Sequence, residues 1–141
     1  MTIYADTSFF VSLYARDTHS AAALEFMKAK PRVQFSPLHF AECCHAMSQQ
    51  VFYRKISEGD AQDIYRDIRN DLSAGVWIET MIPDNAFDRC ADLARRHGPK
   101  LGVRTLDSLH VACALELKAE RFWTFDERQS KLAKAEGLKS T

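Results

Sequence analysis

Short apolar runs alternate with segments of helical periodicity along the whole chain. The apolar runs predict strands at 2–6, 32–36, 76–81 and 121–125. Apolar residues that recur every three or four positions predict helices at 8–15, 19–30, 37–54, 57–75, 84–97, 105–119 and 126–137. Strands that alternate with helices predict a single α/β domain, residues 1–141, around a mainly parallel sheet.

Capping residues and chain breakers set the predicted ends of these helices. Ser57 has the signature of an N-cap, and Thr105 is predicted to cap the apolar helix that follows it. Gly98 and Pro99 are predicted to stop the helix at 84–97. That helix carries an apolar stripe that we expect to face the core, with Leu93 at its edge: Phe87, Cys90, Ala91 and Ala94.

Three carboxylates occupy positions where α/β domains form their sites. Asp6 and Asp126 each follow a predicted strand, and Asp107 lies in the first turn of a nearly all-apolar helix. Each acid alone could simply cap or start a helix. Sites in open α/β sheets form beyond the carboxyl ends of the strands, so we expect the three to converge. Charges 4 Å apart repel by about 4 kcal/mol at an effective dielectric near 20, which a hard cation such as Mg²⁺ or Mn²⁺ would relieve.

Glu42 is a fourth candidate whose position along its helix leaves two interpretations open. It lies in the mostly apolar stretch LHFAECCHAM, roughly opposite a stripe of apolar residues: Phe40, Cys44, Met47 and Val51. Periodicity alone permits either a solvent-facing residue or a member of the site.

Composition and charge narrow the remaining possibilities. The 141 residues are 46% apolar, which is enough for one substantial core. None of the four cysteines has a zinc-ligand spacing, so we expect them to pack as small apolar residues. Positive and negative residues number 19 each, but one acid-free segment is basic, through Arg95, Arg96, Lys100 and Arg104. It is either a solvated helix end and loop or a contact for a phosphate backbone.

Signals for membranes or secretion are missing from the sequence. No apolar run approaches the roughly 18 residues of a membrane span, and no basic start precedes an apolar stretch. We therefore expect a cytoplasmic protein with no membrane association.

Four short motifs, in order, carry a family resemblance. Asp-Thr-Ser follows the first strand, Glu42 comes next, and LDSLHVACAL and WTFD close the series. The chain thereby resembles the PIN-domain nucleases, most closely the VapC toxins of type II toxin–antitoxin pairs. The resemblance implies an α/β/α sandwich and a metal-dependent endoribonuclease. It also implies a homodimer and a VapB-like antitoxin that blocks the acidic cleft.

The same resemblance implies roles for individual residues. It maps the acidic tetrad of the family onto Asp6, Glu42, Asp107 and Asp126, with one or two Mg²⁺ or Mn²⁺ ions. Ser8 and Thr124 would support the ligands or their waters. We expect the four basic residues to guide the RNA backbone: Arg95, Arg96, Lys100 and Arg104. No histidine is needed as a base, although three lie near the acids in sequence: His39, His45 and His110.

The same residues bear on two alternative functions and on one departure from the family pattern. A PIN-like module that binds RNA or protein without cutting is the alternative, although the presence of all four acids disfavours it. A phosphatase of the haloacid-dehalogenase kind would need an acid where Ser8 stands. The final LKST stretch could begin an edge strand, but the last strand usual in the family is expected to be truncated or absent after Leu138.

Overall fold

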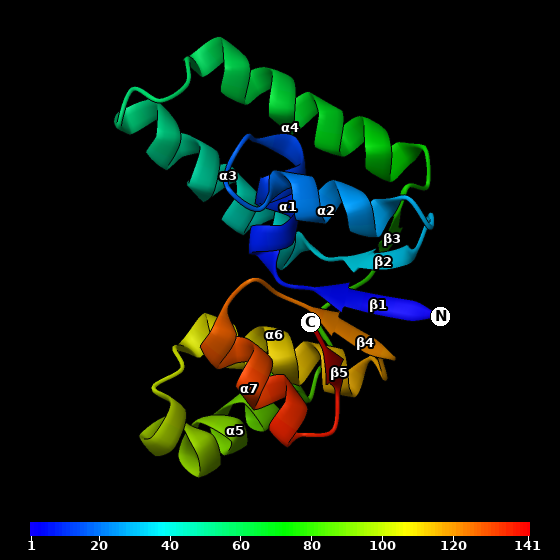
Figure 1. The fold of residues 1–141 in the computed structure, drawn as a ribbon, viewed down its shortest axis with the longest axis vertical. Helices are drawn as coiled ribbons and strands as arrows, with labels where there is room; N and C mark the ends of the chain where they lie inside the picture. The colour runs from blue at the N-terminus through cyan, green and yellow to red at the C-terminus, as the bar shows by residue number, and fades with distance from the viewer.

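A computed structural model describes residues 1–141, with five strands and seven helices (Figure 1). The strands are β1 (Thr2–Ala5), β2 (Arg32–Phe35), β3 (Trp77–Glu79), β4 (Arg121–Trp123) and β5 (Lys139–Ser140). The helices are α1 (Thr7–Tyr14), α2 (Ser20–Met27), α3 (Pro37–Phe52), α4 (Glu58–Ser73), α5 (Ala86–Leu101), α6 (Thr105–Glu116) and α7 (Glu127–Ala135). None of these helices is long and apolar enough to cross a membrane.

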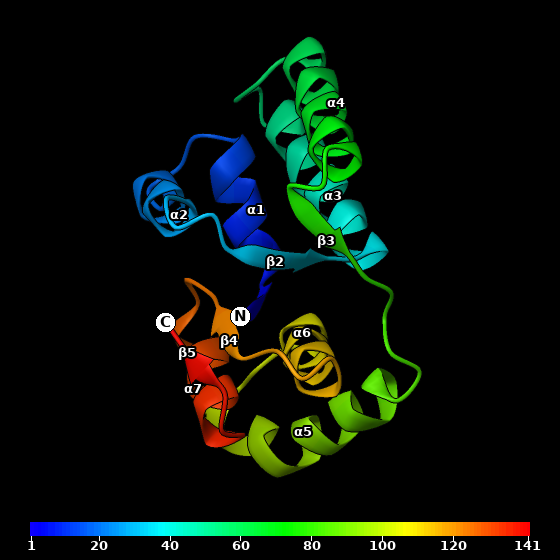
Figure 2. The same cartoon turned by 90° about the vertical axis from the view of Figure 1, so that its right-hand side faces the viewer.

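All five strands are parallel, in the order β3-β2-β1-β4-β5. Helices α1 to α4 lie on one side of the sheet and α5 to α7 on the other (Figure 2). Successive side chains of β1 point to opposite faces, so Ile3 and Ala5 join one buried cluster while Tyr4 joins the other. The predicted α/β/α sandwich with a parallel central sheet is therefore confirmed.

The local signals read from the sequence explain how several helices begin. The side chain of Ser57 accepts a hydrogen bond from the amide of Asp60, and the carboxylate of Asp60 accepts one from the amide of Ser57. Ser36 caps α3 in the same way with His39 as its partner, and Pro37 occupies the first turn. Ser57 as N-cap is thus confirmed.

Helix α5 continues beyond the predicted stop at Gly98 and Pro99. It runs to Leu101 and ends at Gly102, which has a φ of 64° and donates its amide to the carbonyl of Gly98. A proline forfeits one helical hydrogen bond, but a helix that packs well against its neighbours tolerates this loss. The true end is the glycine that can adopt the left-handed conformation.

The core stripe of α5 is also rotated from its predicted position. Ala86, Cys90 and Leu93 are buried, whereas Phe87 is 61% exposed. The buried face is the one that packs against α6, which the sequence of α5 alone could not reveal.

Two further expectations concern helix and sheet ends. Arg104, not Thr105, is the N-cap of α6, and the carboxylate of Asp107 accepts the amide of Arg104 at 3.1 Å. The last strand is short but not absent, since the LKST stretch forms an edge strand in which Lys139 and Ser140 pair in parallel with β4. The hydroxyl of Thr141 stabilises this edge of the sheet by donating a hydrogen bond to the carbonyl of Thr124 at 2.7 Å.

Candidate active site

A cleft of about 710 Å³ opens at the carboxyl-end edge of the sheet, between α1, α3 and the start of α6. Three of the four predicted acids line it: Asp6, Glu42 and Asp107. A separate hollow of about 500 Å³, which includes Phe40 and Arg69, contains none of the predicted residues. The cleft of about 710 Å³ is therefore the candidate active site.

Asp6 lies directly after β1 and caps α1. Its Oδ2 accepts hydrogen bonds from the amide and hydroxyl of Ser8, at 3.1 and 2.6 Å. Its Oδ1 accepts one from Nε2 of Gln129 at 3.2 Å. Burial raises the pKa of Asp6, but the charge of His110 and the bonds from Ser8 and Gln129 outweigh it, so the pKa lies below its usual value. Asp6 is thus held as a carboxylate at the floor of the cleft.

Glu42 reaches the cleft from α3. Its Oε1 accepts hydrogen bonds from the hydroxyl of Thr7, at 2.8 Å, and from Nε2 of His110. The side chain is 23% exposed. Of the two orientations that periodicity allowed, the structure shows the one that faces the site.

Asp107 occupies the first turn of α6 and also lines the cleft. Its Oδ2 accepts the amide of Arg104, at 3.1 Å, and lies 3.3 Å from Nε of the same arginine. The carboxylate is 18% exposed, whereas the Arg104 side chain is 83% exposed at the cleft rim. The guanidinium group of Arg104 is therefore open to solvent and lies beside Asp107.

The structure does not bring the carboxylate of Asp126 into this lining. Asp126 is exposed, and its Oδ1 caps α7 by accepting the amide of Gln129 at 2.8 Å. Thr124, predicted as a supporting residue, donates its hydroxyl to Oε1 of Gln129 at 2.6 Å. Thr124 is therefore connected to Asp6 through Gln129.

Gln129 is a site residue that the sequence analysis missed. It is fully buried, and its Nε2 donates to Oδ1 of Asp6 and to the carbonyl of Asp107, both at 3.2 Å. Gln129 shares the buried face of α7 with Leu132 and Ala133. An uncharged polar residue on the apolar face of a strongly charged helix is the signal that could have found it.

The three histidines near the acids have different surroundings. His110 is buried beneath the cleft, with Nε2 bonded to Glu42 and 3.9 Å from Oδ1 of Asp6. His39 is structural: its Nε2 donates to the carbonyl of Ala5 at 2.8 Å, and burial lowers its pKa to about 3. His45 is exposed.

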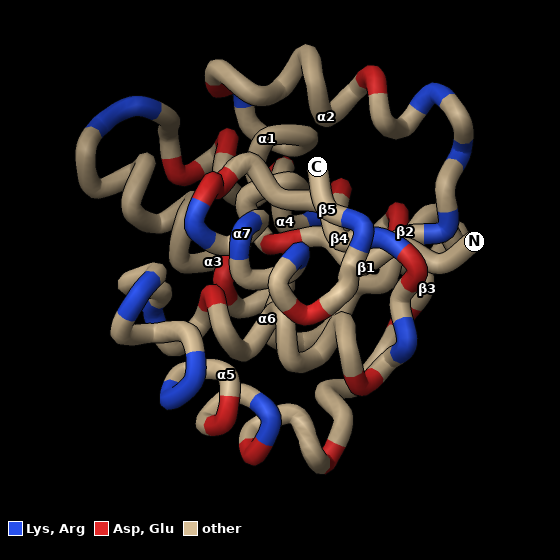
Figure 3. The backbone as a smooth tube through the Cα atoms, turned by 60° about the horizontal axis from the view of Figure 1, so that its bottom comes forward, with Lys and Arg blue, Asp and Glu red and all other residues tan.

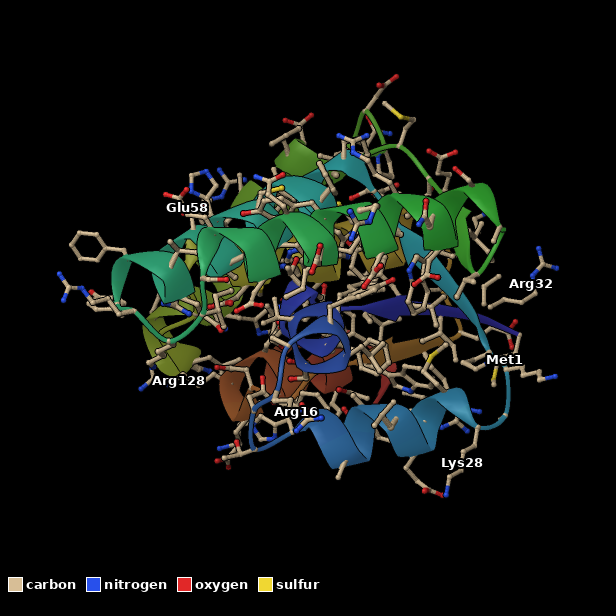
Figure 4. All side chains as sticks on the ribbon, turned by 90° about the horizontal axis from the view of Figure 1, so that it is seen from above. Met1, Arg16, Lys28, Arg32, Glu58 and Arg128 are labelled. Atoms are coloured by element: carbon tan, nitrogen blue, oxygen red, sulfur yellow. The ribbon has the colours of Figure 1, made fainter.

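The predicted basic residues are divided between the cleft and the surface of α5. Only Arg104 lines the cleft. Arg96 is paired with Asp92 and Glu136, and Arg95 and Lys100 are exposed on α5. Positive and negative residues are both scattered over the backbone, as Figure 3 shows. The labelled charged side chains, such as Arg16 and Arg128, lie at the periphery of the molecule (Figure 4).

The donor set suits a hard divalent cation bound through few protein ligands. Three carboxylates border one cleft, but no three Asp, Glu, His or Cys side chains converge closely enough to form a metal cage. Mg²⁺ normally keeps several waters and takes only one or two carboxylates together with substrate phosphates. The residues therefore fit such an ion, and not a fully protein-enclosed metal such as structural zinc.

Comparisons with known proteins agree with this architecture. VapC20 of Mycobacterium tuberculosis, a sarcin–ricin loop cleaving toxin, resembles the chain with a TM-score of 0.69 and 17% identity over 96% of this chain and 95% of its own. FitAcB of Neisseria gonorrhoeae gives 0.69, with 12% identity over 98% and 95%. VapBC2 of Rickettsia felis, solved bound to a DNA fragment from its promoter, gives 0.66, with 14% identity over 100% and 98%.

Sequence comparison supplies the family itself. No curated protein sequence matches the chain. A family model described as PIN domain, however, matches residues 3–135, a range that contains all the residues that line the cleft. The chain therefore belongs to the PIN domain family.

Proposed function

We propose that this protein is an endoribonuclease that hydrolyses RNA phosphodiester bonds with the help of Mg²⁺ or Mn²⁺. The observation that carries the proposal is the cleft that Asp6, Glu42 and Asp107 line beside the exposed Arg104. Membership of the PIN domain family supports nuclease chemistry. VapC20 is a toxin that cleaves the sarcin–ricin loop, and the similarity to it supports RNA as the substrate class.

Asp6 and Asp107 are the proposed primary ligands of the cation, and Glu42 would hold a second ion or orient the attacking water. Asp126 remains a proposed fourth ligand, although its carboxylate serves as the cap of α7. A bound divalent ion would supply an acidified water and neutralise charge at the scissile phosphate.

The residues around the acids have separable tasks in this proposal. Ser8 and Gln129 fix both oxygens of Asp6, and Thr7 and His110 fix Oε1 of Glu42. Arg104 at the rim would bind the RNA backbone, because a guanidinium pairs with phosphate through two parallel hydrogen bonds. Arg95 and Lys100, which are exposed on α5, would bind further phosphates of the RNA backbone.

We further propose that the protein is the toxin of a type II toxin–antitoxin pair in the cytoplasm and forms a homodimer. The similarity of the fold to VapBC2 and FitAcB supports a VapB-like antitoxin as partner. Such an antitoxin would place a basic side chain against the carboxylates of the cleft. This would neutralise the cleft and exclude RNA from it.

Replacing Asp6 tests the proposed nuclease. Asp6→Asn keeps the shape of the side chain but removes the charge, so cleavage of a total RNA extract in Mg²⁺ or Mn²⁺ should fall by more than about 100-fold. The control is Asp67→Asn, an exposed acid on α4, which should cut at the wild-type rate. Circular dichroism should show both variants folded.

Two outcomes of that experiment would contradict the proposal. Wild-type cleavage by folded Asp6→Asn would remove Asp6 from the site, and cleavage unaffected by EDTA would remove the divalent cation. Binding of RNA without any cleavage by the wild-type protein would favour the non-cutting PIN-like module instead.

A further inference from the structure

His110 lies beneath the candidate active site with both ring nitrogens engaged. It is 1% exposed. Nδ1 lies 2.8 Å from the hydroxyl of Tyr4, and Nε2 is bonded to Oε1 of Glu42. The hydroxyl of Thr7 lies 3.2 Å from Nε2 and donates to the same oxygen of Glu42 at 2.8 Å. Because the ring has no open nitrogen and no access to solvent, it is not placed to take a proton from water.

The hydrogen-bond partners decide where the protons in this network lie. A carboxylate oxygen can only accept, and the hydroxyl proton of Thr7 is already donated to Glu42. Nε2 of His110 must therefore carry a hydrogen and donate it to Glu42. Burial, and next the neighbouring Cys113, raise the pKa of Tyr4 well above its usual value, so its hydroxyl keeps its proton while it is bonded to Nδ1.

We propose that Tyr4 and His110 are positioning residues that hold Glu42 in the cleft for cation binding. This inference rests on the proposed function. The relay runs from β1, through α6, to α3, and Thr7 of α1 joins it at Glu42. It therefore links four elements of the fold at a single carboxylate oxygen.

The geometry gives the relay a specific consequence for Glu42. All its hydrogen bonds from protein groups are made through Oε1, while the side chain borders the cleft. Fixing one oxygen in this way selects a single rotamer and leaves Oε2 for a cation or its waters. Hydrogen-bonded partners of this kind orient metal ligands, and their loss typically reduces metal affinity 10- to 100-fold.

The test measures Mn²⁺ binding to the full chain by titration calorimetry, without RNA. Tyr4→Phe removes one hydroxyl, and we expect it to weaken Mn²⁺ binding by about 10-fold, the lower end of that range. His110→Leu should weaken binding by up to about 100-fold, whereas His110→Gln, which keeps an N–H donor near Nε2, should recover part of the loss.

Tyr14→Phe is the matched control. The hydroxyl of Tyr14 is also engaged, by Asp71 and by Nε1 of Trp77, but Tyr14 does not line the cleft. Its removal should lower the melting temperature without changing Mn²⁺ affinity. If Tyr4 only stabilised the fold, Tyr4→Phe would behave like Tyr14→Phe and would lower the melting temperature without changing Mn²⁺ affinity.

Each outcome decides the inference. Folded Tyr4→Phe with wild-type Mn²⁺ affinity would overturn it while leaving the proposed nuclease intact. If Tyr4→Phe does not fold, equal affinities of His110→Leu and His110→Gln would overturn it instead. A wild-type protein that binds no Mn²⁺ would remove both the inference and the proposed cation-dependent function.

Discussion

At the scale of single residues, Asp6 shows how a buried carboxylate is kept charged. Removing water from around the group disfavours its charge, and this is the largest influence on its pKa. His110, Ser8 and Gln129 together reverse that effect. These three residues belong to α6, α1 and α7, so the charge depends on groups far apart in the sequence.

Gln129 provides a prediction at this scale. Gln129→Leu removes the donor to Asp6 and the acceptor for the Thr124 hydroxyl, while keeping a side chain of similar size. RNA cleavage should fall by about 10- to 100-fold, because the Asp6 carboxylate loses its fixed orientation. The measurement is initial cleavage rate at a temperature well below the melting transition.

The comparison variant for this prediction is Gln62→Leu on α4, an exposed glutamine. It should retain the wild-type rate. Unchanged cleavage by Gln129→Leu would show that the bond to Asp6 has no functional consequence.

At the scale of elements, α5 shows how tertiary packing overrides local pattern. The helix passes through Pro99 and turns Leu93, not Phe87, toward the core. Its contacts with α6 are the most extensive between any two elements of the fold. Burial of apolar surface against α6 therefore decides which face of α5 points inward.

Alanine substitutions on α5 test this orientation. Leu93→Ala should lower the free energy of unfolding by about 2–5 kcal/mol, because it leaves a cavity in the core between α5 and α6. Phe87→Ala should change it by no more than about 0.5 kcal/mol, since the ring is mostly in solvent. Urea denaturation measures both. A larger loss for Phe87→Ala than for Leu93→Ala would contradict the observed packing.

At the scale of the whole molecule, charge pairs connect the outer helices below the sheet. Glu136, just beyond α7, accepts hydrogen bonds from Arg96 of α5 at 2.6 and 3.1 Å. Its side chain is 13% exposed. The bonds from Arg96 lower the pKa of Glu136; burial acts in the opposite direction, and His97 assists the lowering. Folding therefore favours the charged form of this carboxyl group.

The lowered pKa of Glu136 predicts how the stability of the protein depends on pH. A carboxyl group whose pKa is lower in the folded state contributes stability above its unfolded pKa, about 4.3, and loses it as the pH falls through the folded value. Glu136→Gln should therefore melt below the wild type at pH 7, by no more than about 4 °C. The difference should disappear in strong acid.

Thermal melts at several pH values check this dependence. Glu25→Gln is the control, because Glu25 forms only an exposed pair with Lys28 and should show no such pH-dependent difference. A constant difference between Glu136→Gln and the wild type from pH 7 to pH 3 would mean that titration of Glu136 is not the cause.

The sequence by itself determined the order of strands and helices, and it placed Asp6 and Asp107 where a site forms. This was possible because apolar periodicity and helix capping depend on neighbours only a few residues away. The same reasoning could not locate the end of α5, because burial against α6 stabilises the helix beyond Gly98 and Pro99.

Only the tertiary structure decided which polar groups share the cleft. The packing of α3 beside α1 turned Glu42 inward, and the position of β1 between β2 and β4 brought Tyr4, His110 and Gln129 beneath the acids. Asp126 shows the converse, since its carboxylate is used by its own helix. Contacts over more than 100 residues of chain, such as Tyr4 with His110, have no local signature, because they arise only when the sheet and its two helical layers assemble.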